Sequence, residues 1–241
     1  MKNISREKDR AYDERRKAEI ITGYLDSNPY SVLITTGKTK VICTATTGNW
    51  MPPHIKNQNK GWVTAEYSML PSSSPFRIRR ERAGAKGRTR EIERMIARSL
   101  RSVCELEMMP MESVIVDCDV IQADGGTRTA SITGGFVALY LLLDDLYKRR
   151  KLPRFPINNF LAATSVGVIH GQAALDLDCA EDQIAQVDMN VVMTENGMFS
   201  EIQASGEEAT FSPAHLTDMV KLGTKGVKEL IQLQREALSP K

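Results

Sequence analysis

The sequence has few of the residues from which disulfide scaffolds and zinc sites are built. Its four cysteines contain no C-x-x-C pair, and its three histidines are scattered without an H-E-x-x-H pattern. These spacings argue against the common structural and catalytic zinc sites. Three of the cysteines stand among apolar or strand-like neighbours, so we expect the cysteines to be reduced and mostly buried.

Long apolar stretches and repeats are absent too. No apolar run reaches the roughly 18 residues that a membrane-spanning helix needs, and there is no repeat of solenoid period or low-complexity tract. The first residues, MKNISREKDRAYDERR, carry charges of both signs and lack the apolar core of a signal peptide. We therefore expect a cytoplasmic globular protein, and 241 residues are enough to bury a real core.

The formal net charge of only +2 conceals an uneven distribution. Between Arg77 and Arg101 lie ten basic residues, nine of them arginine, against three acidic ones. The planar guanidinium group suits the binding of phosphates or carboxylates. A solvated helix face with salt bridges to a neighbouring element explains the same composition, and the sequence pattern alone leaves both interpretations open.

The hydrophobic pattern predicts a mixture of strands and helices in irregular order. Strands are predicted at 30–47 (two strands joined at Gly37-Lys38), 62–70, 112–122, 161–178 (two strands turning at His170-Gly171) and 188–205 (a hairpin turning at 195–197). Helices are predicted at 89–106, from about 129 to 148–151, and at 213–238. This order favours an α+β fold with mixed sheets packed against helices. We treat residues 1–241 as a single domain with two structural halves, joined by the linker 149–156.

A small, hydroxyl-rich segment, GGTRT at Gly125–Thr129, precedes a long apolar helix. Consecutive backbone N–H groups in a glycine turn form an anion-binding concavity, and a helix N-terminus adds partial positive charge. The segment lacks the lysine of a Walker A loop and the G-x-G-x-x-G spacing of dinucleotide-binding folds. It is therefore a candidate phosphate cradle, with an ordinary glycine turn and helix cap as the alternative.

A second cluster is acidic. Five carboxylates lie within DLDCAEDQIAQVDMN, followed by one amide: Asp176, Asp178, Glu181, Asp182, Asp188 and Asn190. Oxygen ligands of this kind suit Mg²⁺ or Mn²⁺ rather than zinc, although an acidic loop before a strand is the simpler interpretation. In an extended segment, Asp188 and Asn190 share one face. A phosphate cradle, an arginine field and carboxylates together fit phosphoryl chemistry on RNA.

Several longer stretches resemble the ribonuclease PH family of phosphorolytic 3′-exoribonucleases. They are GKTKVICTA, GWVTAEYSMLP, GRTREIERMIARSLR, DCDVIQADGGTRTASITGG, SVGVI and LDLDCAEDQIAQVDMNVVMT, in family order and over nearly the whole chain. The resemblance implies the ribonuclease PH fold, which is also seen in the second domain of ribosomal protein S5.

The resemblance also implies an activity. Family members remove nucleotides beyond the 3′ CCA end of tRNA precursors, with roles in tRNA and rRNA processing. Inorganic phosphate is the attacking co-substrate, nucleoside diphosphates leave, and the transfer is reversible. Mg²⁺ or Mn²⁺ is implied as cofactor, and a hexameric ring, a trimer of dimers, as the assembly. Two rivals are a non-catalytic RNA-binding ring subunit of the same fold and a hydrolytic nuclease that uses only carboxylates.

Carried over residue by residue, the resemblance assigns roles to particular positions. Phosphate binding falls on Arg88, Gly126, Thr127 and Arg128. Metal binding falls on Asp182 and Asp188, with Asn190 where the related polynucleotide phosphorylase has a lysine. The residues expected to carry catalysis are Arg88, Thr127, Arg128, Asp182 and Asp188, and RNA contacts are expected at Arg77, Arg79 and Arg80.

The chain departs from the family pattern in three regions, one of which is Pro110-Met111-Glu112, where the family has Gly-Glu after the long helix. The usual QGTAEG is QASGEE here, at 203–208, which keeps a glutamine at Gln203 and an acid at Glu207. The N-terminal Gly-Arg of the family is Asp9-Arg10, and its later Arg-Pro is Arg16-Lys17. We expect the QASGEE change and the change at 110–112 to affect loop shape, and the N-terminal changes to affect contacts with RNA.

Overall fold

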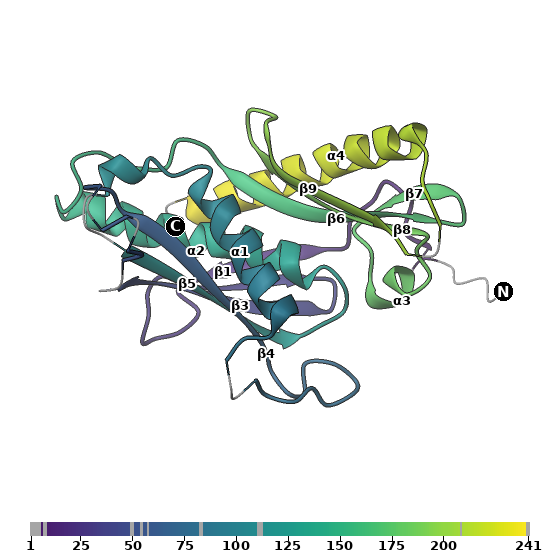
Figure 1. Cartoon of the computed structure of the whole chain (residues 1–241), viewed down its shortest axis with the longest axis horizontal. Helices are drawn as coiled ribbons and strands as arrows, with labels where there is room; N and C mark the ends of the chain where they lie inside the picture. Colours follow the sequence, from purple (N-terminus) through teal and green to yellow (C-terminus); the bar gives the residue numbers. More distant parts are fainter. Residues whose placement is uncertain are drawn as a thin grey trace.

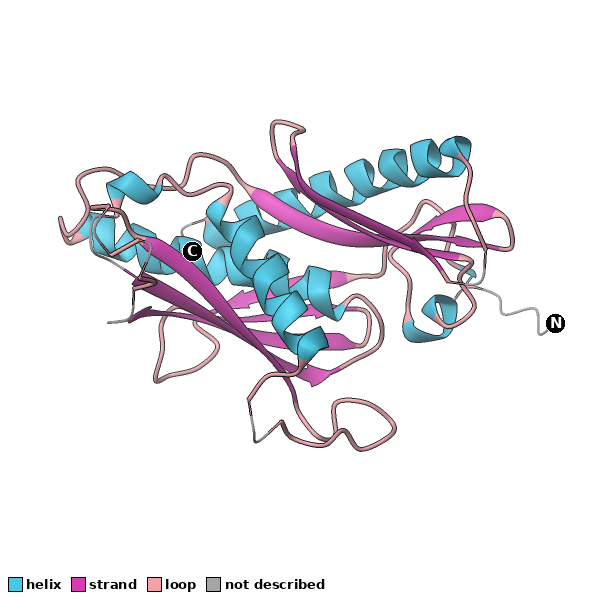
Figure 2. Cartoon of the chain, in the orientation of Figure 1, coloured by secondary structure: helices cyan, strands magenta, loops and turns pink. Residues whose placement is uncertain are grey.

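The computed structural model describes residues 6, 9–48, 51–53, 55–56, 58–81, 84–109, 113–207 and 209–239. Two β-sheets are arranged with four α-helices packed against and between them (Figures 1 and 2). Mixed sheets combined with helices make this an α+β fold, as predicted.

The first sheet has five strands in the order β1-β2-β3-β5-β4. The strands are β1 (Ala18–Thr22), β2 (Ser31–Thr36), β3 (Thr39–Gly48), β4 (Trp62–Met69) and β5 (Ser113–Gln122). All neighbours are antiparallel except β4 and β5, which run parallel. Side chains alternate along β3, so that Val41, Cys43 and Ala45 are fully buried while Lys40 and Thr46 are exposed.

The second sheet has four antiparallel strands in the order β7-β6-β8-β9. They are β6 (Leu161–Ile169), β7 (Gln172–Leu175), β8 (Val187–Thr194) and β9 (Phe199–Gly206). The predicted turn at His170-Gly171 is present, with both residues at positive φ, and Gly197 adopts positive φ in the predicted hairpin turn. Val187, Met189 and Val191 lie in the core under α4, so Asp188 and Asn190 share the opposite face as predicted.

The α-helices are α1 (Gly87–Arg101), α2 (Thr127–Lys148), α3 (Cys179–Asp182) and α4 (Pro213–Leu238), with a short 3₁₀ turn at Leu106–Met108. Helix α1 packs on β4, whereas α4 lies along the second sheet (Figure 1). Helix α2 contacts both sheets, through β2 and β3 on one side and β6 on the other. The buried Gln234 of α4 joins these parts, because its Nε2 donates to Thr133 O (3.0 Å) and Leu161 O (2.9 Å).

Helix α2 approaches the first sheet closely at Gly134. A Cβ atom there would lie 2.7 Å from Ile34 Cγ2 and 2.9 Å from Cys43 Sγ, so a larger residue would push the helix away. By length and hydropathy α2 passes as a membrane-spanning helix, but 78% of the window concerned is buried inside the protein. It is the core helix, and its position fixes where its N-terminus, the predicted phosphate cradle, lies.

The cysteines agree with the sequence prediction. Cys43, Cys104 and Cys118 are buried, Cys179 is half-buried, and all four are free thiols. Burial raises the pKa of Cys104 to about 12, so its unreactive thiol form dominates at neutral pH.

Several element boundaries differ from prediction. Helix α1 ends at Arg101 rather than Leu106, because Cys104 pairs with Ile157 as an isolated bridge and Glu105 N–H donates to Pro156 O (2.8 Å). Helix α2 begins at Thr127 instead of Thr129. Two short elements, β1 and α3, were not predicted from the sequence pattern.

Candidate functional site

The predicted phosphate cradle is an open helix N-terminus. Gly125 and Gly126 adopt left-handed conformations, with φ of 75° and 67°, and Gly126 is the N-cap residue of α2. No described side chain caps this helix, and its first turn contains no acidic residue. The first backbone N–H groups of α2 therefore remain available to an anion, with Thr127 and Arg128 in the same turn.

Two distant side chains hold the backbone that precedes the cradle. Thr39 Oγ1 donates to Gly125 O (2.6 Å) and accepts from Asp124 N–H (2.9 Å). The Arg16 guanidinium donates to Asp124 O and, more weakly, to Gly125 O (3.5 Å). Thr39 and Arg16 thus hold the carbonyl groups of Asp124 and Gly125, and the N–H groups of the two glycines point away from these side chains.

Arg16 is itself fixed by a buried ion pair. Its Nε and Nη2 donate to the two carboxylate oxygens of Asp176 at 3.0 and 2.7 Å, and its backbone N–H donates to Asp176 Oδ2 (2.8 Å). Burial lowers the pKa of Arg16, but the carboxylates of Asp176 and Asp124 outweigh this effect and raise it. This bidentate pair connects the N-terminal segment, the cradle and the strand end that leads to α3.

Gly125 is also pressed against the chain leading to α3. A Cβ atom on it would lie 2.4 Å from Leu177 O and 2.9 Å from Asp178 Cα, so only glycine fits here. Asp178 caps α3, and Glu181, the partner in its capping box, is buried and paired with Arg6 (2.7 Å) and Arg10 (2.8 Å).

Three of the acids in the predicted cluster are therefore structural. Asp176 pairs with Arg16, Asp178 caps α3, and Glu181 binds the two N-terminal arginines. The departures near the N-terminus fall in this network: Asp9, where the family has glycine, has φ of 55°, a conformation that aspartate tolerates. Asp182 and Asp188 remain as the acids without such a role.

Asp182, at the end of α3, and Asp188, on β8, influence each other. Desolvation, followed by repulsion from Asp182, raises the pKa of Asp188 to about 6. Desolvation also raises the pKa of Asp182. Glu207 adds to the repulsion on both, so the acid kept in the QASGEE segment lies near this pair. Excess negative charge at one place favours a cation.

The pair fits Mg²⁺ by its donor chemistry. Among the described residues, no group of three His, Cys, Asp or Glu side chains is placed to hold a metal. Mg²⁺ is commonly bound by one or two carboxylates, with water and substrate phosphates completing its shell. Two mutually repelling carboxylates beside a phosphate cradle match that pattern better than a closed protein site.

Arg88 and Arg128 bring positive charge to the same place from different elements. Arg88 is exposed in the first turn of α1, and Arg128 is half-buried in the first turn of α2. Both guanidinium groups oppose the rise in the pKa of Asp182 that desolvation causes, with Arg128 exerting the larger effect. The structure thus brings Arg88, Arg128 and Asp182 together.

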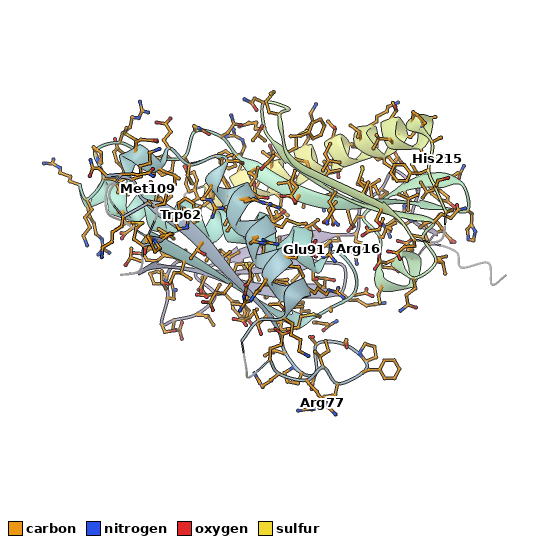
Figure 3. The ribbon with its side chains drawn as sticks, viewed as in Figure 1. Arg16, Trp62, Arg77, Glu91, Met109 and His215 are labelled. Atoms are coloured by element: carbon orange, nitrogen blue, oxygen red, sulfur yellow. The ribbon has the colours of Figure 1, made fainter. Side chains whose placement is uncertain are left out.

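Contacts between α1 and β9 hold the helix that carries Arg88 against the second sheet. Gln203 Nε2 donates to Glu91 Oε1 (2.9 Å), and Arg98 pairs with Glu201 (3.2 Å). Figure 3 shows Glu91 near the centre of the molecule, on the helix that carries Arg88. The glutamine kept in the QASGEE segment therefore serves to dock α1.

Tyr67 is a site residue that the sequence analysis did not single out. It lies on β4, its side chain is buried, and its Oη is 2.9 Å from Thr127 Oγ1. Burial raises the pKa of Tyr67, while Thr127, Arg88 and Arg128 act to lower it. The alternation of β4 predicts an inward-facing tyrosine, but its partner 60 positions away leaves no local signal.

The arginines predicted to contact RNA lie apart from this cluster. Arg77, Arg79 and Arg80 are exposed, on the loop between β4 and α1 that projects from the body of the protein (Figure 3). None of them forms an ion pair with another described residue. The base of the loop is fixed, because Ala123 N–H donates to Ser73 O (2.7 Å) and Ile78 N–H to Pro71 O (2.9 Å).

Sequence comparison identifies the family. Residues 14–142 match domain 1 and residues 159–226 match domain 2 of the 3′ exoribonuclease family, the ribonuclease PH family. The chain belongs to this family. It is 49% identical over 229 residues to ribonuclease PH of Listeria welshimeri, covering 94% of this chain and 92% of that one. It is 50% identical over 228 residues to ribonuclease PH of Bacillus cereus, covering 93% of each chain.

Solved structures share the fold at low sequence identity. The Archaeoglobus fulgidus exosome with RNA bound to the active site matches with a TM-score of 0.76 and 18% identity, over 92% of this chain and 90% of that one. Rice Rrp46 matches with a TM-score of 0.74 and 17% identity, over 97% and 100%. The predicted ribonuclease PH fold is confirmed.

We predict that Arg16→Met lowers the free energy of unfolding by about 3–5 kcal/mol, because it leaves the buried Asp176 carboxylate without its partner. The neighbouring Arg15→Met is the matched control. Arg15 pairs with Glu229 at 2.9 Å in a more exposed position, so we expect a loss below about 1 kcal/mol. Urea denaturation of both variants measures the difference, and equal losses would contradict the role given to the Arg16–Asp176 pair.

Proposed function

We propose that this chain trims the 3′ ends of tRNA precursors, with inorganic phosphate as the attacking group and nucleoside diphosphates as products. As a member of the ribonuclease PH family it is a phosphate-dependent 3′-exoribonuclease. The observation that best supports phosphorolysis is the uncapped N-terminus of α2, which carries Thr127 and Arg128 beside the acidic pair. A hydrolase has no need for such a phosphate site.

The roles of the residues follow from charge. Arg88, Arg128, the Thr127 hydroxyl and the N–H groups behind Gly126 bind and orient phosphate, which reduces the repulsion between two anions. Attack on the last phosphodiester then requires no protein nucleophile. Because one phosphate ester is exchanged for an anhydride of similar energy, the same site should also extend RNA from nucleoside diphosphates.

Asp182 and Asp188 would hold a divalent cation, Mg²⁺ or Mn²⁺. When bound, the cation supplies positive charge that stabilises the leaving 3′ oxygen and the scissile phosphate. The support is the raised pKa of Asp188 and the repulsion from Asp182, which a cation relieves. Asn190, buried on the same face of β8, carries no charge where a relative has lysine.

RNA would approach along the projecting loop. Arg77, Arg79 and Arg80 are exposed there without ion-pair partners among the described residues, and such cations attract the RNA backbone. The neighbouring Phe76 is 87% exposed, and an exposed aromatic ring beside arginines suits stacking on a base.

Assembly and location are parts of the same proposal. The fold is shared with exosome core proteins, which supports a ring; we propose a hexamer built as a trimer of dimers, acting in the cytoplasm. A non-catalytic ring subunit is disfavoured, because the cradle, Arg88, Asp182 and Asp188 are all present and placed together.

The deciding experiment incubates a 3′-extended tRNA with the protein and Mg²⁺, with and without inorganic phosphate, and identifies the mononucleotides. Nucleoside diphosphates that appear only with phosphate support the proposal. Monophosphates formed without phosphate would identify a hydrolase. RNA binding without release in either condition would identify a scaffold.

We predict that Arg128→Ala lowers the rate of phosphorolysis by on the order of 100-fold or more, while RNA affinity is kept. Removing one hydrogen-bond donor from a developing oxyanion usually has an effect of this size. Arg149→Ala is the control, since Arg149 forms an exposed pair with Asp145 (2.9 Å) at the far end of α2. Initial rates at varied phosphate and RNA gel-shift assays give both quantities. An unchanged KM for phosphate in Arg128→Ala would contradict the assignment of Arg128 to the phosphate cradle.

We predict that Asp188→Asn folds, assembles and loses activity. Its free energy of unfolding should match or slightly exceed that of the wild type, because the repulsion from Asp182 and Glu207 is relieved. Calorimetric titration should show weakened Mg²⁺ binding, whereas Asp13→Asn, which changes an exposed partner of Lys225, should bind Mg²⁺ normally. Normal Mg²⁺ affinity in Asp188→Asn would place the metal elsewhere.

A further inference from the structure

A buried phenol lies directly behind the phosphate cradle. Tyr67 Oη is 2.9 Å from Thr127 Oγ1, and no other described side chain is recorded as its hydrogen-bond partner. Tyr67 as a whole residue is only 6% exposed, and its hydroxyl contact with Thr127 is partly buried. A buried hydroxyl group strongly favours donating its proton to an available acceptor, and here that acceptor is Thr127.

The direction of this hydrogen bond decides what Thr127 can do. A threonine hydroxyl group has one proton to donate. If Thr127 donates to Tyr67, it has no proton left for phosphate, whose oxygens accept in a charge-assisted bond. If Tyr67 donates to Thr127, the threonine proton remains available to the anion. Only the second arrangement satisfies the phenol, the threonine and the phosphate together.

The surrounding charges favour that arrangement. Arg88 and Arg128 both act on the phenol electrostatically, and positive charge attracts the oxygen lone pairs and repels the proton. Thr127 is further fixed through its backbone, because Ser131 Oγ donates to Thr127 O (2.9 Å). The hydroxyl groups of Tyr67 and Thr127 are thus held 2.9 Å apart before phosphate arrives.

We propose that Tyr67 is a positioning residue for phosphate, which donates its phenolic proton to Thr127 and thereby directs the Thr127 proton toward the bound anion. The proposal rests on the proposed function in that it assigns phosphate to the α2 N-terminus. It adds a residue from β4, outside the GGTRT segment, to the determinants of phosphate affinity. The same effect should apply to the terminal phosphate of a nucleoside diphosphate in the reverse reaction.

The experiment compares Tyr67→Phe with the wild type in phosphate-dependent release from 3′-extended tRNA. We expect the KM for phosphate to rise about three- to tenfold, the effect of weakening one hydrogen bond to a charged group, with little change in kcat or RNA affinity. Tyr30→Phe is the matched control, since Tyr30 Oη also donates a hydrogen bond, to Asp145 Oδ2 (2.6 Å), far from the cradle. It should alter stability without altering this KM.

A double-mutant cycle separates positioning from general packing. If Tyr67 acts through Thr127, Tyr67→Phe should raise the KM no further in a Thr127→Val background. A wild-type KM in Tyr67→Phe, or the same rise in both backgrounds, would overturn the proposal. Calorimetric titration of the wild type and of Tyr67→Phe with inorganic phosphate measures phosphate binding without the reaction. If the wild type releases no nucleoside diphosphates, that result counts against the proposed function and not against the role of Tyr67.

Discussion

The buried pair of Arg16 and Asp176 joins three segments that are far apart in the chain. Arg16 belongs to the N-terminal segment, Asp176 follows β7, and the Arg16 guanidinium also holds the carbonyl groups of Asp124 and Gly125. Gly125 in turn packs against the backbone that leads to α3. The position of the phosphate cradle relative to Asp182 therefore depends on this pair, on the hydrogen bonds of Thr39 to the same backbone, and on the absence of a side chain at Gly125.

The positive and negative groups near the cradle belong to different layers of the fold. The two arginines stand on the first turns of α1 and α2, which pack on the first sheet, whereas Asp182 and Asp188 belong to α3 and the second sheet. The arginines of the first group counter the effect of desolvation on Asp182 in the second. The charged groups assigned to the proposed site are thus distributed over both halves of the chain, and neither half contains all of them.

The elements with strong periodicity or clear turn signals could be predicted from the sequence, as α4 and the hairpin turn at Gly197 show. Boundaries set by tertiary pairing could not, because the end of α1 depends on contacts of Cys104 and Glu105 with 156–157. The family motifs located Arg88, Arg128 and the aspartates. Tyr67 and Arg16 act through partners 60 and 160 positions away, which no local pattern reveals. The spacing of Asp178 and Glu181 is that of a capping box, although the same residues also fit the predicted acidic cluster.

The hydrogen bond from Ala123 N–H to Ser73 O ties the projecting loop to the backbone just before the cradle. With Ile78 N–H bound to Pro71 O, the loop closes at its base and leaves its tip free of the protein body. Insertions or substitutions at the tip would therefore not displace the cradle. Under the proposed role of this loop in RNA binding, changes at its tip would alter the preference for one RNA over another and leave the cradle where it is.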